Sequence, residues 1–151
     1  MILDHSHLTE QELIDALGQL KSIRAEIGIL ERKVRHLEQI VEHRKNVSRK
    51  MMDEGESWEN ITRFINPVFE VYQATIRHTS SCLEEYNQLM QFIYAIPDSL
   101  IRRILIERYV NGHTWLRVAF IIGENDEQYP RKLHNRFVAE YVRRHNSSYQ
   151  I

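Results

Sequence analysis

Side chains that could bind nucleic acid gather near the C-terminal end of the sequence. Residues 129 to 145 include five basic side chains and a single acid, Glu140. Arginine can donate two parallel hydrogen bonds to guanine, asparagine can pair with adenine in the same way, and lysine suits a phosphate group. The residues that we expect to contact DNA are Arg131, Lys132, Asn135 and Arg136, with Arg117, Arg143 and Arg144 as contacts to its backbone.

A helix is needed to position these side chains. If it begins near Gln128 or Tyr129 and continues to Arg144, Leu133, Phe137 and Tyr141 share its inner face, because residues four apart lie one above the other. Pro130 fits only in the first turn, since proline has no N–H to donate. The expected DNA contacts at 131, 132, 135 and 136 then point outward near the N-terminal half of the helix.

Two further helices are predicted before the basic one. Residues 99–110 carry a broad apolar face, and the polar residues 111–113 then turn the chain. Thr114 can cap the helix that follows, because its hydroxyl accepts from an unpaired N–H, and Gly123 can end it in the left-handed conformation. We expect Trp115 to lie in the core beneath these helices.

The order of helix, short turn, compact second helix with the small residue Ala119, and basic helix is that of a helix-turn-helix. Particular residues in this order form recognisable motifs. They are Pro97, Asp98, Leu100 and Arg102 at the first helix start, Arg108, Tyr109 and Gly112 at the turn, Thr114, Trp115, Val118 and Ala119 in the second helix, Gly123 at its end, and Arg131, Leu133, His134 and Arg136 in the basic helix.

On these motifs, about a third of the chain resembles the region-4 domain of sigma-70-type RNA polymerase factors. It is similar above all to the small sigma-like helix-turn-helix proteins of phages and mobile elements, which place a helical arm before that module. The resemblance implies a sequence-specific DNA-binding regulator of transcription. No segment resembles the core-binding and −10-reading region of a complete sigma factor.

Phe120 and Ile121 depart from the family pattern. The family usually has exposed acidic residues in the helix that corresponds to the one capped here by Thr114. Phe120 and Ile121 make this helix apolar nearly all round, and such a surface is normally covered, here by the arm or by a partner protein. A second hypothesis is therefore an adaptor that binds RNA polymerase or a phage component through Phe120 and Ile121. A third is a small terminase-like subunit for DNA packaging, with its helix-turn-helix in a ring.

The N-terminal part of the chain has the heptad pattern of a coiled-coil arm, with apolar residues alternately three and four apart. We expect one helix over about 9–51, started by a capping box of Thr9 and Glu12. A hairpin of two helices has little surface to bury, so we expect a homodimer or higher oligomer. The heptad residues assigned to oligomerisation are Leu13, Leu20, Ile23, Ile27, Leu30, Val34 and Leu37.

A loop at about 52–58 follows, where Gly55 can take the positive φ of a tight reversal. Asn66 and Pro67 look like the cap and first residue of a second helix over 67–95, after a short helix at 57–65. Its predicted apolar stripe is Ile65, Phe69, Tyr72, Ile76, Thr79, Leu83, Tyr86, Met90 and Ile93. The short connection favours an antiparallel hairpin.

The predicted fold class is therefore all-α, with an arm over 1–96 and a helix-turn-helix domain over 97–151. Only 5 Gly and 3 Pro interrupt the chain. The arm carries 11 basic and 15 acidic residues and the second domain 9 basic and 6 acidic, so the basic part is the one expected to meet a polyanion.

The composition also bears on other classes of function. The single cysteine, Cys82, cannot form an internal disulfide, and this fits a reducing cytoplasm. We expect no membrane segment, metal site or cofactor, because there is no long apolar run, no ligand spacing of a known motif and no glycine-rich phosphate loop. Nothing resembles a catalytic constellation, so we do not expect an enzyme.

Overall fold

The computed structural model describes residues 6–150, and all regular secondary structure within them is helical. The chain forms two compact units. One contains residues 25–84, and the other contains the N-terminal segment up to residue 24 together with residues from 85 onward. This division differs from the sequence-based one at 96, because both ends of the predicted arm pack with the C-terminal helices.

The first helix, α1 (Glu10–Gly18), begins with the predicted capping box: Thr9 Oγ1 accepts from the N–H of Glu12, whose side chain accepts from the N–H of Thr9. The predicted helix over 9–51 is present but is not continuous. The helix is interrupted at Gln19, and α2 (Leu20–Asp53) follows. At this point the N–H of Gln19 bonds to the carbonyl of Ala16, three residues back, and Gly18 adds no side chain to support a regular turn.

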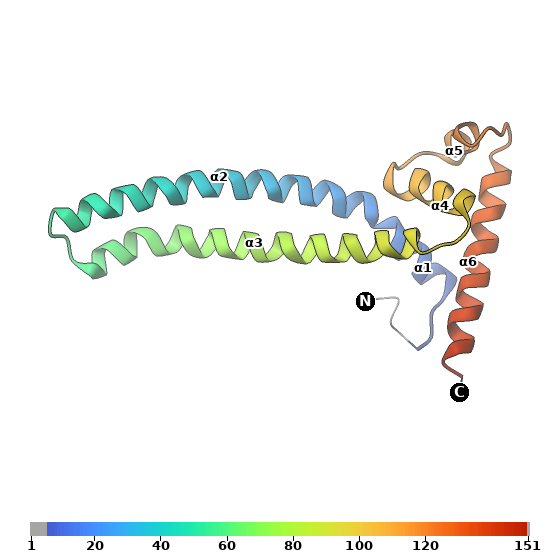
Figure 1. Ribbon diagram of the computed structural model, residues 1–151, viewed down its shortest axis with the longest axis horizontal. Helices are drawn as coiled ribbons and strands as arrows, with labels where there is room; N and C mark the ends of the chain where they lie inside the picture. Colours follow the sequence, from blue (N-terminus) through green and yellow to red (C-terminus); the bar gives the residue numbers. More distant parts are fainter. Residues whose placement is uncertain (1–5, 151) are drawn as a thin grey trace. The chain divides into compact units, whose positions relative to one another are not determined.

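Residues 25–84 form the predicted antiparallel hairpin of α2 and α3 (Trp58–Tyr94), whose ribbons run side by side in Figure 1. The cross-helix contacts show the direction, because residue numbers rise along α2 while they fall along α3. Glu26 meets His78, Glu38 accepts from the Tyr72 hydroxyl, and Arg44 donates to the carbonyl of Phe64. Gly55 turns the chain with φ 82°, as predicted.

The predicted helix start at Asn66 and Pro67 is wrong, because α3 begins at Trp58 and continues through Pro67. An interior proline deprives the carbonyl four residues back of its donor and crowds that turn. That carbonyl belongs to Arg63, and the Arg44 guanidinium lies at the next carbonyl of the same turn: its Nη1 is 2.6 Å from the carbonyl oxygen of Phe64, and its charge lies 4.9 Å from the centre of the Phe64 ring. A donor from the opposite helix thus supports the turn that proline weakens.

The packed face of α3 is rotated slightly from the predicted stripe. Six of the nine residues of that stripe lie inward, but Phe69, Ile76 and Leu83 are exposed by 37–38%. Their places are taken by residues one position earlier, which complete a regular alternation of four and three. The inward row comprises Ile61, Ile65, Val68, Tyr72, Thr75, Thr79, Cys82, Tyr86, Leu89 and Ile93.

The residues assigned to oligomerisation serve the chain's own packing. Leu13, Leu20 and Ile23 are buried in the unit with the C-terminal helices. In the hairpin Ile27 and Leu30 are buried, and Val34 and Leu37 are half-buried. Pairing with a second copy through these side chains would therefore compete with contacts that the single chain already makes.

The second unit contains the helices that follow the arm. They are α4 (Ser99–Leu105), a single π-helical turn η2 (Ile106–Val110), α5 (Trp115–Ile121) and α6 (Gln128–Ser148), and Figure 1 shows α4 and α5 beside the N-terminal half of α6. The end of α6 is also tied to the N-terminal segment, because the Asn146 amide exchanges two hydrogen bonds with the backbone of Leu8. The largest fully buried side chains of this unit are Leu8, Leu13, Leu17, Leu20, Ile93, Ile104, Leu105, Val118, Pro130 and Val138.

Candidate nucleic-acid interface

The helices before α6 are fixed by caps that the sequence signals. Asp98 Oδ1 accepts from the N–H groups of Leu100 and Ile101 at the start of α4. Thr114 Oγ1 accepts from the N–H of Arg117, as predicted, and Gly123 follows α5 with φ 88°. Arg103 of α4 donates to the carbonyl of Ile121 at 3.0 Å. The ends of α4 and α5 are thereby joined, which holds α5 at a fixed place against α4.

Helix α6 begins at Gln128, in agreement with the sequence, but its inner face is rotated by about one residue. Pro130, His134 and Val138 are buried, whereas the predicted inner residues Leu133, Phe137 and Tyr141 are only half-buried. The predicted row covers one flank of the helix, where the Tyr141 ring meets Phe92 of α3 edge-on at 4.9 Å. The helix is packed on more than one side, and a single i, i+4, i+8 row could not describe it.

The outer face of α6 carries exposed basic residues. Lys132, Arg136 and Arg143 are exposed, and so is the small residue Ala139 between them. The spacings 132, 136, 139 and 143 follow one stripe of an α-helix. We call these four residues the basic stripe. It joins three of the predicted DNA contacts on one surface, and Ala139 leaves room for a close approach.

The remaining predicted contacts lie in different surroundings. Arg144 is exposed but forms an ion pair with Glu140 one turn earlier. Arg117 is exposed on α5, where its guanidinium carbon lies 5.6 Å from the centre of the Phe120 ring. Arg131 is half-buried, and its nearest acid is Glu127, at 3.7 Å. Neither Arg131 nor Asn135 shares the basic stripe.

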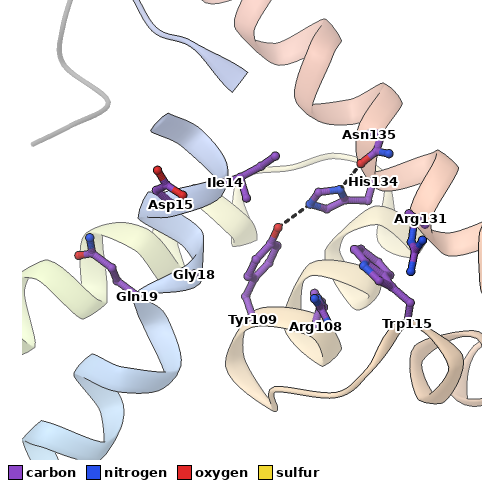
Figure 2. A pocket seen from close by; sticks show the side chains of 10 residues that line it. All are labelled: Ile14, Asp15, Gly18, Gln19, Arg108, Tyr109, Trp115, Arg131, His134 and Asn135. Carbon is purple, nitrogen blue, oxygen red and sulfur yellow. Dashed lines mark hydrogen bonds between the residues drawn. The ribbon is translucent and has the colours of Figure 1, made fainter. Parts of the chain in front are cut away.

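Arg131 and Asn135 instead line a cleft of about 500 Å³ between α6, η2, α5 and α1. Figure 2 shows their side chains on one wall with His134, and Asp15 and Gln19 on the wall that α1 provides. The Nε atom of Arg131 is buried there without a hydrogen-bond partner. The complete lining is Ile14, Asp15, Gly18, Gln19, Arg108, Tyr109, Trp115, Arg131, His134 and Asn135.

A buried polar pair lies at the bottom of this cleft (Figure 2). The Tyr109 hydroxyl is 2.6 Å from His134 Nε2, and His134 Nδ1 is 2.9 Å from the amide oxygen of Asn135. Since that oxygen only accepts, Nδ1 carries the proton and Nε2 accepts from Tyr109. The π-helical turn η2, which changes the spacing at the end of α4, places Tyr109 opposite His134.

Burial governs the ionisation of the pair. It raises the pKa of Tyr109 to about 12, against a smaller lowering by the charge of Arg108. It also lowers the pKa of His134, although the hydrogen bond to Asn135 opposes this. Both groups are therefore neutral near neutral pH, and the pair acts as a structural hydrogen bond that fixes α6 on η2. Nothing in the sequence motif indicated this contact, because the two residues lie 25 positions apart.

Trp115 is half-buried at the edge of the cleft. Its ring meets His134 edge-on at 5.0 Å, and the Arg108 guanidinium lies over it at 4.8 Å from the ring centre. Trp115 therefore packs against His134 of α6 and beneath Arg108, but it is half-buried and not in the core as expected.

The two apolar residues proposed as a partner interface differ in exposure. Phe120 is 69% exposed, whereas Ile121 is half-buried. Leu116, one turn before Phe120, is 59% exposed. The sequence-based prediction missed Leu116, although the spacing of four between two large apolar residues on a short helix could have indicated it. Leu116 and Phe120, which we call the α5 apolar pair, form the uncovered side of α5.

None of the helices in the described part of the chain is long and apolar enough to cross a membrane. Comparisons of the chain with models of protein families, with curated proteins and with solved structures found no match. The function is therefore inferred from the residues and contacts described above.

Proposed function

We propose that this chain is a sequence-specific DNA-binding regulator of transcription, of the type found in phages and mobile elements. In this proposal α4 with η2, α5 and α6 form the helix-turn-helix, and α6 enters the major groove. The observation that carries it is the basic stripe: Lys132, Arg136 and Arg143 are exposed on one face of α6, while the opposite face is buried. Such a face suits a groove that displays bases between two rows of phosphates.

The contacts of α6 divide the predicted DNA residues into two groups. Arg136 and Lys132 are the candidates for base and phosphate contacts, with Arg143 and Arg117 on the backbone. Asn135 cannot pair bidentately with adenine while its amide oxygen accepts from His134. In our proposal Arg131 and Asn135 therefore support the position of α6. Arg131 contacts DNA only if its half-buried side chain leaves the cleft, and the exposed Asn135 reads a base only if it releases His134.

DNA selection from a random library by the full chain, at stated salt, tests the proposal. A common sequence motif should emerge, and fluorescence anisotropy should show tight binding to it. A triple variant of Lys132, Arg136 and Arg143 to alanine should bind at least about tenfold more weakly. The matched control replaces Lys33, Arg35 and Lys45, three exposed basic residues of α2, with alanine. No enrichment at low salt, or equal loss in both variants, would contradict the proposal.

The α5 apolar pair supports a second function, in which the module binds a protein such as RNA polymerase or a phage component. Leu116 and Phe120 lie one turn apart and are both exposed, as expected for a helix that inserts into an apolar groove. Pull-down from a host lysate compares the wild type with Phe120→Asp, and Trp58→Asp, another exposed aromatic, serves as control. Equal recovery of every partner by the Phe120 variant counts against this function.

Self-association remains part of the proposal, with a changed surface. The heptad residues first assigned to oligomerisation are buried or half-buried within the chain. The apolar row that remains exposed for pairing with a second copy is Phe69, Ile76 and Leu83, spaced by one heptad on α3. Analytical ultracentrifugation should show a dimer that Ile76→Glu weakens, and Val71→Glu is the control outside the row. Native mass spectrometry separates this from the packaging hypothesis, because a ring has more copies than a dimer.

A further inference from the structure

Three side chains that commonly bind metals meet on one side of the hairpin. They are the Glu26 carboxylate of α2 and the His78 imidazole and Cys82 thiol of α3. One ligand atom of each lies within 4.8 Å of the other two. His78 Nε2 is already 3.0 Å from Glu26 Oε1. The cluster lies wholly within residues 25–84, far along the sequence from the proposed DNA contacts.

The hairpin creates this cluster from separate parts of the sequence. His78 and Cys82 are four residues apart, so they project from neighbouring turns on one side of α3. The antiparallel α2 brings Glu26 to them, although it lies 52 residues before His78. Only two of the ligands are close in sequence and the third comes from the opposite helix, which is why the sequence analysis predicts no metal site.

We propose that Glu26, His78 and Cys82 bind a zinc ion that links α2 to α3. Thiolate, imidazole and carboxylate are the three protein ligand types that Zn²⁺ accepts. Ligands at about 2.0–2.3 Å from a tetrahedral ion are roughly 3.3–3.7 Å from one another. The cluster therefore needs to contract by about 1 Å at its widest separation, which rotation of the two exposed side chains can supply.

Burial distinguishes the roles of the ligands. The thiol of Cys82 is buried in the hairpin seam, whereas the side chains of His78 and Glu26 are 57% and 49% exposed. Zinc enters from the solvent side and displaces the thiol proton, which passes to water, while a water molecule occupies the fourth position. Because the thiol must lose its proton, affinity rises with pH.

Zinc binding would stabilise the hairpin specifically. This unit has a polar seam that buries Ser48 and Thr79. A metal that binds the folded hairpin and not the unfolded chain raises its stability by mass action. The proposal does not depend on DNA binding.

Cobalt titration of the reduced full chain tests the proposal, since Co²⁺ replaces Zn²⁺ and its thiolate complexes absorb strongly in the near ultraviolet. One equivalent per chain should produce the thiolate band and tetrahedral ligand-field bands, and Zn²⁺ should remove both. Zn²⁺ should also raise Tm. Cys82→Ala should abolish the thiolate band, and His78→Gln or Glu26→Gln, changes at exposed positions, should weaken binding by about tenfold or more.

His43→Gln is the matched control, an exposed histidine of α2 outside the cluster, and it should leave binding unchanged. Circular dichroism confirms that each variant is helical before titration. Absence of the thiolate band in the wild type would overturn the proposal. So would undiminished affinity in both His78→Gln and Glu26→Gln, which would mean binding by the thiol alone, or a stoichiometry of one ion per two chains.

Discussion

The two compact units are stabilised in different ways. The unit that contains α4, α5 and α6 has all the largest fully buried side chains, including Ile104, Leu105 and Val118. The hairpin is a single layer of two helices whose seam includes Ser48 and Thr79, and the Ser48 hydroxyl has no hydrogen-bond partner. A regular heptad pattern predicts that two helices pair, but it does not predict where the deep apolar core lies. That core forms where several short helices meet.

The largest expected difference between the units concerns core leucines. Leu105→Ala, at a fully buried position, should lower the free energy of unfolding by about 2–5 kcal/mol, because it removes apolar contacts and leaves a cavity. Leu30→Ala in the hairpin should cost less, since a two-helix layer can relax around the site. Urea unfolding of both variants measures this. A greater loss for Leu30→Ala would reverse the comparison.

Two tyrosines sharpen the same contrast. Tyr109→Phe should cost about 1–3 kcal/mol, because it leaves His134 Nε2 buried without a donor. The hairpin counterpart is Tyr72→Phe, which removes a 3.3 Å bond to the exposed Glu38 and should change stability little. Urea unfolding distinguishes them, and equal effects would mean that the Tyr109–His134 bond does not hold α6.

The pH dependence of stability should come mainly from the C-terminal unit. Because burial lowers the pKa of His134, its contribution is complete above about pH 6.5 and is lost as the pH falls below that value, with a slope of at most about 1.4 kcal/mol per pH unit. Tyr109, with its pKa raised to about 12, contributes fully below about pH 10 and loses its contribution as the pH rises toward 12.

Urea unfolding between pH 5 and pH 8 measures the acid side of this dependence. His134→Gln should flatten the profile below pH 6.5, and the control His43→Gln, on the exposed side of α2, should not. If the profile of His134→Gln matched that of the wild type, the neutral Tyr109–His134 pair would be contradicted.

Two turn glycines give the smallest difference. Gly55 of the hairpin and Gly112 after η2 both have positive φ, so alanine is strained at either position by about 1 kcal/mol. Only at Gly112 does an added Cβ meet another side chain, at 2.7 Å from Cδ of Lys21. Gly112→Ala should therefore shift the unfolding midpoint slightly more than Gly55→Ala, unless Lys21 moves aside freely.

Local signals in the sequence predicted the helices of this chain well. The Thr9 capping box, the Thr114 cap, the reversal at Gly55 and the start of α6 near Gln128 are confirmed, because each depends on residues close in sequence. Predictions that needed a distant partner were less accurate. The start of α3 was misplaced at Pro67, since the support that Arg44 gives to this turn comes from the opposite helix.

At the candidate site too, predictions from residues close in sequence are more accurate than those that depend on a distant partner. Exposure of Lys132, Arg136 and Arg143 agrees with the predicted outer face of the basic helix. Arg131 and Asn135 were expected on that face, but both line the cleft between α6 and α1, where Arg131 is half-buried and the exposed Asn135 is held by its contact with His134. Periodicity within α6 could not reveal this cleft, because its opposite wall, α1, lies more than a hundred positions earlier in the sequence.

The salt dependence of DNA binding tests the central claim most directly. Each phosphate contact releases counterions, so the slope of log K against log salt concentration changes by about 0.9 for every phosphate that a variant no longer neutralises. We predict that replacing Lys132, Arg136 and Arg143 with alanine lowers the magnitude of this slope by roughly 2–3, whereas the Lys33, Arg35 and Lys45 control in the hairpin keeps the wild-type slope. The same slope in all three proteins would contradict a DNA interface on the outer face of α6.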